Sequence, residues 1–228
     1  MKIELRAVDK YYNRGGRNQV YALRGIDLTI DATETVCIHG PSGSGKSTLL
    51  SILGGIIGPT SGSAVVDGKK MARLPDRFLT LYRREHIGFI FQRFQLIPEL
   101  SVLENVTLPL LPLGVRPADQ KKRAMVLLER LAIDHRSDFR AAEISGGELQ
   151  RAAVARALIN DPMIIIADEP TAHLDAQLAE EFMDILSVLH NEGKTIIIAS
   201  HDPFIHEHPL VSMTITLRGG RVEGITPA

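Results

Sequence analysis

The sequence has 228 residues, of which 44% are hydrophobic, and 26 basic residues nearly balance 27 acidic ones. This length and composition suffice for a hydrophobic core without disulfides. The even charge, with no long run of either sign, excludes the basic surface typical of nucleic-acid-binding proteins. The single cysteine, Cys37, favours a reduced compartment, and no apolar run approaches the roughly 20 residues that span a bilayer. We therefore expect a cytoplasmic protein whose membrane role, if any, is peripheral.

The N-terminal part of the chain predicts two strands, at residues 2–8 and 22–30, because apolar and polar residues alternate there. The first residues lack the apolar core of a signal peptide. A turn is expected at 13–18. Just before it stand Tyr11 and Tyr12, and one of these rings could stack on an adenine. A cross-strand aromatic on a half-buried sheet explains them equally well.

Residues 40–48 read Gly-Pro-Ser-Gly-Ser-Gly-Lys-Ser-Thr, between an apolar strand at 35–38 and a helix that runs to residue 53. This matches a phosphate-binding loop in its required strand–loop–helix context, where glycines let successive N–H groups face an anion. Lys46 would reach the β- and γ-phosphates, and the Ser47 hydroxyl would coordinate Mg²⁺. The alternative is a glycine turn with a surface lysine. The residues expected to bind nucleotide are Gly40, Ser42, Gly43, Ser44, Gly45, Lys46, Ser47 and Thr48.

The next segment predicts a strand at 63–68, a helix at 71–84 and a buried strand at 87–91 that stops at Gln92. A polar side chain at the carboxyl end of a strand is placed to contact a ligand, although a loop glutamine is an equal alternative. From Arg93 the pattern becomes helical, with apolar, proline-marked residues at 108–114. These residues would fill the core or form a docking surface for another protein.

Ser145-Gly146-Gly147-Glu148 opens a further helix that ends near residue 160. A helix N-terminus with paired glycines is suited to receive an anion. Ser145 and Glu148 also have capping-box spacing, so an ordinary helix start is the alternative.

Two more apolar strands, at 163–167 and 195–199, end in polar residues. Asp168 and Glu169 follow the first, where a metal–phosphate complex would offset the cost of burying carboxylates. Asp168 would hold Mg²⁺, and Glu169 would orient and deprotonate the attacking water. An exposed acidic turn is the alternative.

His201 follows the second strand at the same edge and would meet a γ-phosphate. No third-ligand pattern supports a metal site of His201 with His206 and His208. A helix at 176–190 and a final hairpin at 213–222 complete the chain.

With these motifs in order, the chain resembles the ATP-binding subunit of an ABC transporter over essentially its whole length. Ser145-Gly146-Gly147-Glu148 is the most diagnostic part, since it matches that family's signature. The resemblance implies a RecA-like α/β phosphate-loop core with an antiparallel β subdomain and a helical subdomain. We expect one domain over 1–228, with the helical subdomain at roughly 93–155.

The resemblance also implies the roles of individual residues. Tyr12 is similar to the adenine-stacking aromatic, with Tyr11 as the alternative. Gln92 matches the Q-loop glutamine, a catalytic residue and Mg²⁺ ligand. Asp168 matches the Walker B aspartate, and Ala172 to Asp175 match the D-loop. The catalytic residues implied are Glu169, His201, Gln92 and Lys46, and the metal ligands Ser47, Gln92 and Asp168, with ATP and Mg²⁺ as cofactors.

The family implies that two copies pair head to tail, each ATP lying between one copy's phosphate loop and the other's Ser145–Glu148 segment. The pair would drive an integral membrane permease that docks near residues 92–117, at the cytoplasmic face of the membrane. The segments Phe91–Pro98 and Ala167–Thr171 are similar to the MacB/LolD-like subgroup.

Two alternatives stay open: a soluble ABC-type regulator, and a division-related ATPase that transmits force without transport. Tandem nucleotide domains or basic extensions would favour the first, and the sequence has one phosphate loop. The chain departs from the family at Ile144, Leu149, His173 and Thr33, and His173 raises a question about contacts across the pair.

Overall fold

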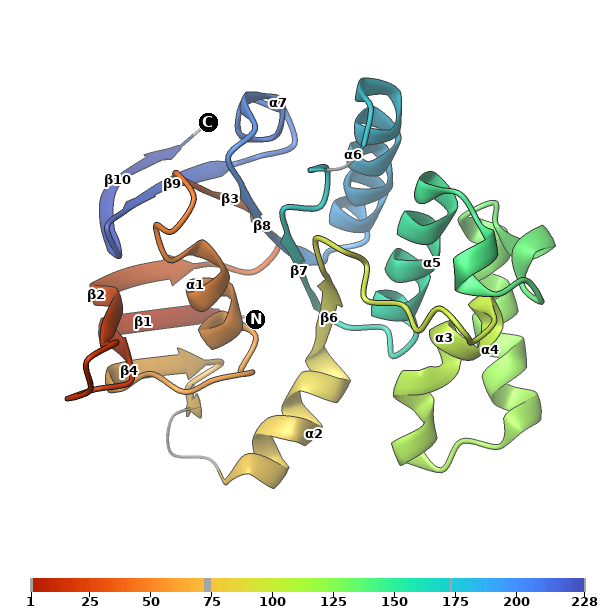
Figure 1. The fold of residues 1–228 in the computed structure, drawn as a ribbon, viewed down its shortest axis with the longest axis horizontal. Helices are drawn as coiled ribbons and strands as arrows, with labels where there is room; N and C mark the ends of the chain where they lie inside the picture. Colours follow the sequence, from red (N-terminus) through yellow and green to blue (C-terminus); the bar gives the residue numbers. More distant parts are fainter. Residues whose placement is uncertain (1, 72–74, 173, 228) are drawn as a thin grey trace.

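The computed structural model describes residues 2–71, 75–172 and 174–227, which fold into two β-sheets with helices around them (Figure 1). The smaller sheet is antiparallel, in the order β2-β1-β4-β5. It lies on the left of Figure 1, away from α3 and α4 on the right. Its strands are β1 (Ile3–Tyr12), β2 (Val20–Ile30), β4 (Ser61–Val66) and β5 (Lys69–Lys70).

The larger sheet has the order β10-β9-β3-β8-β7-β6 and is parallel except for the edge strand β10. The parallel neighbours are far apart in sequence, so connections that contain helices cross the faces of the sheet, whereas β9 and β10 form a hairpin. Its strands are β3 (Thr35–His39), β6 (Ile87–Ile90), β7 (Ile164–Asp168), β8 (Thr195–Ser200), β9 (Met213–Arg218) and β10 (Arg221–Pro227).

Helices cover the parallel sheet and fill the segment between β6 and β7. None of those in the described ranges is long and apolar enough to cross a membrane. The α-helices are α1 (Lys46–Leu53), α2 (Asp76–His86), α3 (Val102–Thr107), α4 (Pro117–Arg130), α5 (Gly146–Leu158), α6 (Ala176–Asn191) and α7 (Pro203–His206), with a 3₁₀ helix at Leu108–Leu113. The predicted fold class is confirmed.

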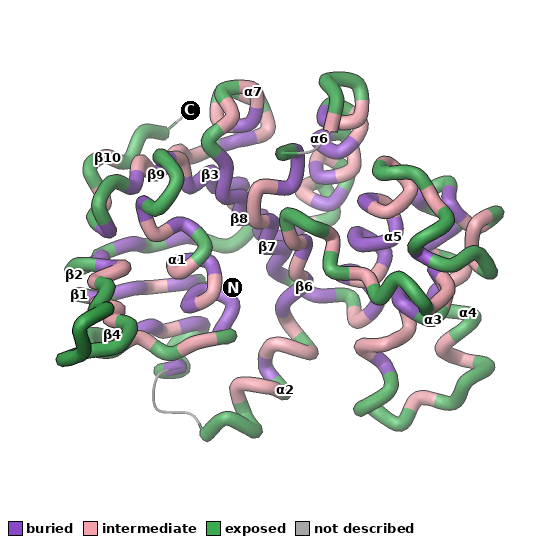
Figure 2. The backbone as a smooth tube through the Cα atoms, in the orientation of Figure 1, coloured by how far each residue is buried: buried purple, intermediate pink, exposed green. Residues whose placement is uncertain are grey.

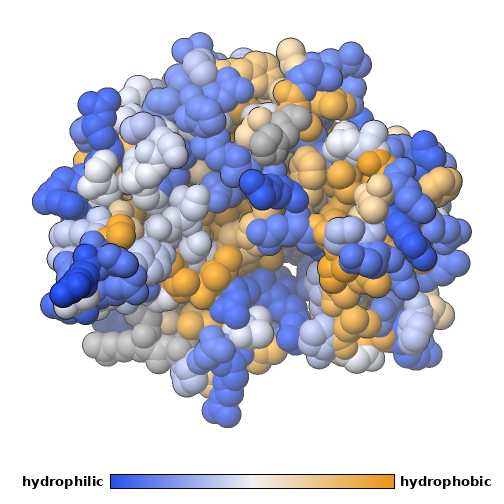
Figure 3. Space-filling model, in the orientation of Figure 1, coloured by the Kyte–Doolittle hydropathy of each residue, from blue (hydrophilic) through white to orange (hydrophobic). Residues whose placement is uncertain are grey.

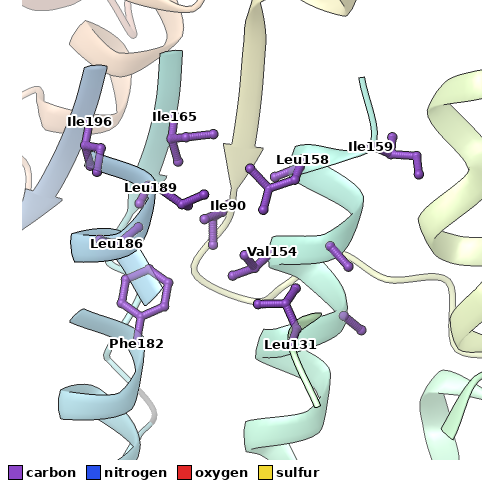
Figure 4. Close-up of a cluster of buried hydrophobic side chains, with 14 of the residues drawn as sticks. Ile90, Leu131, Val154, Leu158, Ile159, Ile165, Phe182, Leu186, Leu189 and Ile196 are labelled. Carbon is purple, nitrogen blue, oxygen red and sulfur yellow. The ribbon is translucent and has the colours of Figure 1, made fainter. Parts of the chain in front are cut away.

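The core lies on both faces of the parallel sheet, because successive side chains of a strand point to opposite faces. In β7, Ile164 and Ile166 pack towards the antiparallel sheet, and Ile165 and Ala167 towards α5 and α6. Figure 2 shows the central strands buried along their length. In Figure 4, side chains of α5 and α6 meet over Ile165 and Ile90. Burial of each such side chain contributes roughly 1.5–3 kcal/mol and joins the helices to the sheet.

The boundaries of several elements differ from the prediction. The first two strands extend to Tyr12 and back to Val20, so the connection between them is residues 13–19, close to the turn predicted at 13–18. β4 begins at Ser61, two residues earlier than expected, and β6 ends one residue earlier, at Ile90. Within the described residues the helix predicted over 71–84 is α2, which begins at Asp76 after the extended Pro75. The predicted residues 72–74 lie outside the described residues.

Candidate functional site

The phosphate loop lines a cleft of about 680 Å³ at the carboxyl ends of β3, β7 and β8. Four predicted residues from distant parts of the sequence meet it there: Tyr12, Gln92, Glu169 and His201. A larger cleft of about 750 Å³, beside α4, contains none of the residues predicted to bind nucleotide or metal, so lining chemistry and not size identifies the site. The loop residues in the cleft are Pro41, Ser42, Gly43, Ser44, Gly45, Lys46, Ser47 and Thr48.

The conformation of the phosphate loop depends on glycine at both of its ends. A Cβ on Gly40 would lie 2.1 Å from the carbonyl oxygen of Leu217, so no larger residue fits. Gly45, with φ of 106°, begins α1 in a conformation that favours glycine. The Gly220 N–H donates to the carbonyl oxygen of Ser44 at 3.0 Å, which fixes the loop against the β9–β10 turn.

Lys46, Glu169 and His201 form a chain of polar contacts in the cleft. The buried Lys46 Nζ donates to the Gly40 carbonyl oxygen at 2.8 Å and lies 3.2 Å from Oε1 of Glu169. The other carboxylate oxygen, Oε2, lies 2.9 Å from Nδ1 of His201. The Glu169 side chain is 13% exposed, whereas that of His201 is 64% exposed. One carboxylate, held on both sides, therefore faces the cleft beside the lysine.

Asp168 has the features of a magnesium ligand. Its Oδ1 is buried and has no hydrogen-bond partner within the described residues. Burial raises the pKa of Asp168, and a hydrogen bond with Ser47 opposes this rise. An unpaired carboxylate oxygen beside a serine hydroxyl offers the hard oxygen ligands that Mg²⁺ prefers, so these residues fit that ion.

The structure does not support the histidine metal site. In the ranges that the structure describes, no group of three or more His, Cys, Asp or Glu side chains is arranged to hold a metal. His206 instead packs against His39, with ring centroids 4.3 Å apart. The departure at His173 lies outside the described residues.

The two adjacent tyrosines of β1 occupy different environments. Tyr11 pairs with Tyr21 of β2, and their rings stack with centroids 3.9 Å apart. Tyr12 is 39% exposed and lines the cleft. Tyr11 is therefore the cross-strand aromatic, and Tyr12 is the ring that faces the cleft.

Ser145 caps α5, and both halves of its capping box with Glu148 are present. Oε2 of Glu148 accepts from the Ser145 N–H at 2.8 Å, and Oε1 accepts from Nε of Arg136 at 2.7 Å. These bonds lower the pKa of Glu148 to about 2. Neither this residue nor its neighbours Ser145, Gly146 and Gly147 are among the residues that line the cleft.

Asp175 caps the next helix, α6, by accepting from the N–H of Leu178 at 2.9 Å. It is not among the residues that line the cleft either. Helix α6 packs closely against the start of α5. A Cβ on Gly147 would lie only 2.8 Å from the Leu178 side chain. The starts of α5 and α6 are therefore neighbours, and neither Ser145–Glu148 nor Asp175 lines the cleft.

The prediction missed several residues that line the cleft. Gly219 and Gly220 come from the β9–β10 turn, and Val20, Ala22 and Arg24 from β2. The paired glycines were visible as a hairpin turn. Only the packing of that turn on the phosphate loop places them at the site.

The fold and the cleft define a phosphate-loop nucleotide-binding protein, and comparisons with known proteins identify its family. The model of the ABC transporter family matches residues 23–172. An uncharacterized ABC transporter ATP-binding protein of Thermotoga maritima is 43% identical over 98% of this chain and 94% of its own length. The macrolide export ATP-binding/permease protein MacB of Escherichia coli is 44% identical over 90% of this chain.

Solved structures agree with this result. An ATP-binding cassette solved as a dimer in a post-hydrolysis state with ADP and Pi has a TM-score of 0.90 and 40% identity, over 99% of this chain and 98% of that one. The chain belongs to the ABC transporter ATP-binding family, as the sequence predicted. It spans only about a third (32%) of the length of the Escherichia coli MacB relative.

Proposed function

We propose that this chain is the ATP-hydrolysing subunit of an ABC transport complex, with Glu169 as the residue that activates water. The observation that carries this proposal is the Lys46–Glu169–His201 chain at the mouth of the phosphate loop. A carboxylate beside a phosphate-binding lysine is placed to orient water towards a γ-phosphate.

In this mechanism the N–H groups of the loop and the start of α1 hold the phosphates. Ser47, Asp168 and Gln92 would hold Mg²⁺, which supplies positive charge to the phosphate oxygens. Binding of the phosphates would draw Lys46 away from Glu169, because a triphosphate carries more negative charge than one carboxylate. Glu169 would then be free to accept a proton from water, while His201 holds its second oxygen.

Glu169→Gln tests this assignment. The amide keeps the size of the side chain but cannot accept the proton, so turnover should fall by about 100-fold or more. ATP binding should persist. Phosphate release and ATP titration measure the two effects, and Glu180→Gln, an exposed site on α6, is the matched control. ATP turnover within a few-fold of that of the unsubstituted protein would contradict the assignment of Glu169 as the residue that activates water.

We further propose that two copies pair head to tail around two ATP molecules. Each copy has two helix N-termini suited to bind anions, those of α1 and α5. Of these two, the N-terminus of α1 lines the cleft of the same copy, and that of α5 does not. The second would contact the nucleotide of the other copy through Ser145, Gly146, Gly147 and Glu148, with Asp175 beside them. The solved relative that is a dimer bound to ADP and Pi supports pairing of two copies.

A groove of about 370 Å³ between α2, β6 and the 3₁₀ helix suits a membrane partner. Ile56, Phe91, Pro109 and Pro112 line it, together with Arg83. Figure 3 displays apolar side chains beside the hollow between α2 and α3. We assign this groove to a cytoplasmic helix of a permease, whose apolar face would fill it. The MacB relatives, named as ATP-binding/permease proteins, support this partner and a location at the cytoplasmic face of the membrane.

The permease can be sought by a pull-down of tagged Glu169→Gln protein with ATP and Mg²⁺ from detergent-solubilised membranes. A membrane protein with a large extracytoplasmic domain should come with it. Adding Ile56→Glu, at a 45% exposed groove position, should abolish that capture without lowering the affinity for ATP. Capture that Ile56→Glu leaves intact would place the partner elsewhere. On this proposal residues 1–228 work as one domain, and residues 93–155 as its helical subdomain.

A further inference from the structure

The loop that follows Gln92 is strained. Phe94 and Gln95 have φ values of 56° and 50°, in the left-handed region that disfavours residues with a side chain. Two such residues in succession persist only where the surrounding structure holds them. Local turns bind the N–H groups of these residues, from Phe94 to the Phe91 carbonyl oxygen at 2.9 Å and from Gln95 to that of Arg93, but they leave the carbonyl groups of Phe94 and Gln95 to other partners.

Arg156 of α5 holds this loop from outside. Its Nη1 donates to the carbonyl oxygen of Gln95 at 2.5 Å, and its Nη2 to that of Phe94 at 2.6 Å. The two nitrogens of one rigid guanidinium thus bind the carbonyls of both strained residues. A flexible ammonium group cannot reproduce this planar fork. Burial lowers the pKa of Arg156, but a guanidinium remains charged at physiological pH.

Helix α5 connects this contact to the signature segment. Ser145 caps the helix and Arg156 lies eleven residues further on, which is about 16 Å along the axis. A second link comes from Gln150, whose Nε2 donates to the carbonyl oxygen of Pro170, next to Glu169, at 3.4 Å. Arg156 also lines the groove assigned above to the permease.

We propose that Arg156 is a positioning residue for hydrolysis, which fixes the Gln92 loop to α5 and so couples movement of that helix to the nucleotide site. This inference rests on the proposed function only for the role of Gln92. Arg156 itself does not touch the reacting atoms. It acts by setting where the backbone after Gln92 lies.

Arg156→Gln tests this inference. Hydrogen exchange of the backbone at residues 92–97 should rise at least about tenfold, because the loop loses both of its hydrogen bonds to Arg156. The kcat for ATP should fall by about tenfold with little change in KM. In the Gln92→Ala background, Arg156→Gln should cause almost no further loss, since both changes act through one group. Arg156→Lys should have a kcat between those of Arg156→Gln and the unsubstituted protein.

The matched control is Arg151→Gln, on the same helix. Arg151 bonds to the carbonyl oxygen of Leu131 and to Glu181, away from the Gln92 loop, so exchange at 92–97 should not change. Two results would overturn the proposal. One is a kcat loss in the double variant that equals the product of the two single losses, and the other is hydrogen exchange at 92–97 that Arg156→Gln does not change. The exchange measurement needs no hydrolysis, so it still tests the Arg156 contact if the ATPase assignment fails. If Arg156→Gln does not fold, Arg156→Lys undergoes the same measurements.

Discussion

At the scale of single residues, Tyr11 and Tyr12 differ in their surroundings although they are adjacent. Tyr11 contributes to the antiparallel sheet through its stack on Tyr21. Tyr12 lies at the cleft with Lys10 5.4 Å from its ring centroid. Of these two adjacent tyrosines, Tyr12 is the one that lines the cleft, and we propose that it stacks on the nucleotide base.

We expect Tyr12→Ala to weaken ATP binding by about tenfold, because stacking on a base contributes roughly 1–3 kcal/mol. Its stability should change little. Tyr11→Ala should have the opposite effect, a loss of about 1 kcal/mol in the free energy of unfolding with unchanged ATP affinity. Calorimetric titration and urea unfolding measure both. If Tyr11→Ala is the variant that loses ATP affinity, Tyr11 and not Tyr12 is the ring that stacks on the base.

At the scale of elements, the start of α5 depends on one carboxylate. Glu148 completes the capping box with Ser145 and also pairs with Arg136. Both contacts favour its charged form, and its pKa falls from 4.5 to about 2. Since the folded protein lowers this pKa, the stabilisation is fully present above about pH 4.5 and is lost as the pH falls towards 2.

Glu148→Gln should therefore cost about 1 kcal/mol of unfolding free energy at pH 7. The difference from the unsubstituted protein should shrink steadily below pH 4.5, down to the lowest pH at which both proteins fold. Urea unfolding at a series of pH values measures it, with Glu180→Gln as the exposed control on α6. A difference that does not change with pH would show that the charge of Glu148 is irrelevant to α5.

At the scale of the whole molecule, the proposed site is distributed over two surfaces. The phosphate loop lies in the cleft, and Ser145 lies at the start of a helix that does not line it. In the proposed pair, each surface completes the site of the other copy. ATP then acts as part of the interface, so pairing should depend on it.

Light scattering of Glu169→Gln should give the 25.0 kDa monomer alone and twice that mass with ATP and Mg²⁺. Adding Ser145→Arg should keep the protein monomeric and folded, because a large charged side chain at the signature segment would block the second copy. Circular dichroism checks the fold. Dimers of the Ser145→Arg protein in ATP would contradict the head-to-tail arrangement.

The sequence by itself determined the fold class, the family and most of the site. Motifs such as residues 40–48 are local, because backbone geometry and spacing along a few residues make a phosphate loop. The strands near the site were also predictable, since continuous apolar runs indicate strands buried on both faces. These runs end at Gln92, Asp168 and His201, which predicted polar residues at one edge of the sheet.

Only the tertiary structure decided which of these residues meet and in what state. The order β3-β8-β7-β6 brings His201 to Glu169, and Glu169 to Lys46, although more than 120 residues separate the lysine from the carboxylate. Packing of the same kind separated Tyr11 from Tyr12 and left Oδ1 of Asp168 buried and unpartnered in the described structure. Strand pairing and burial depend on contacts between distant segments, and local sequence patterns do not encode those contacts.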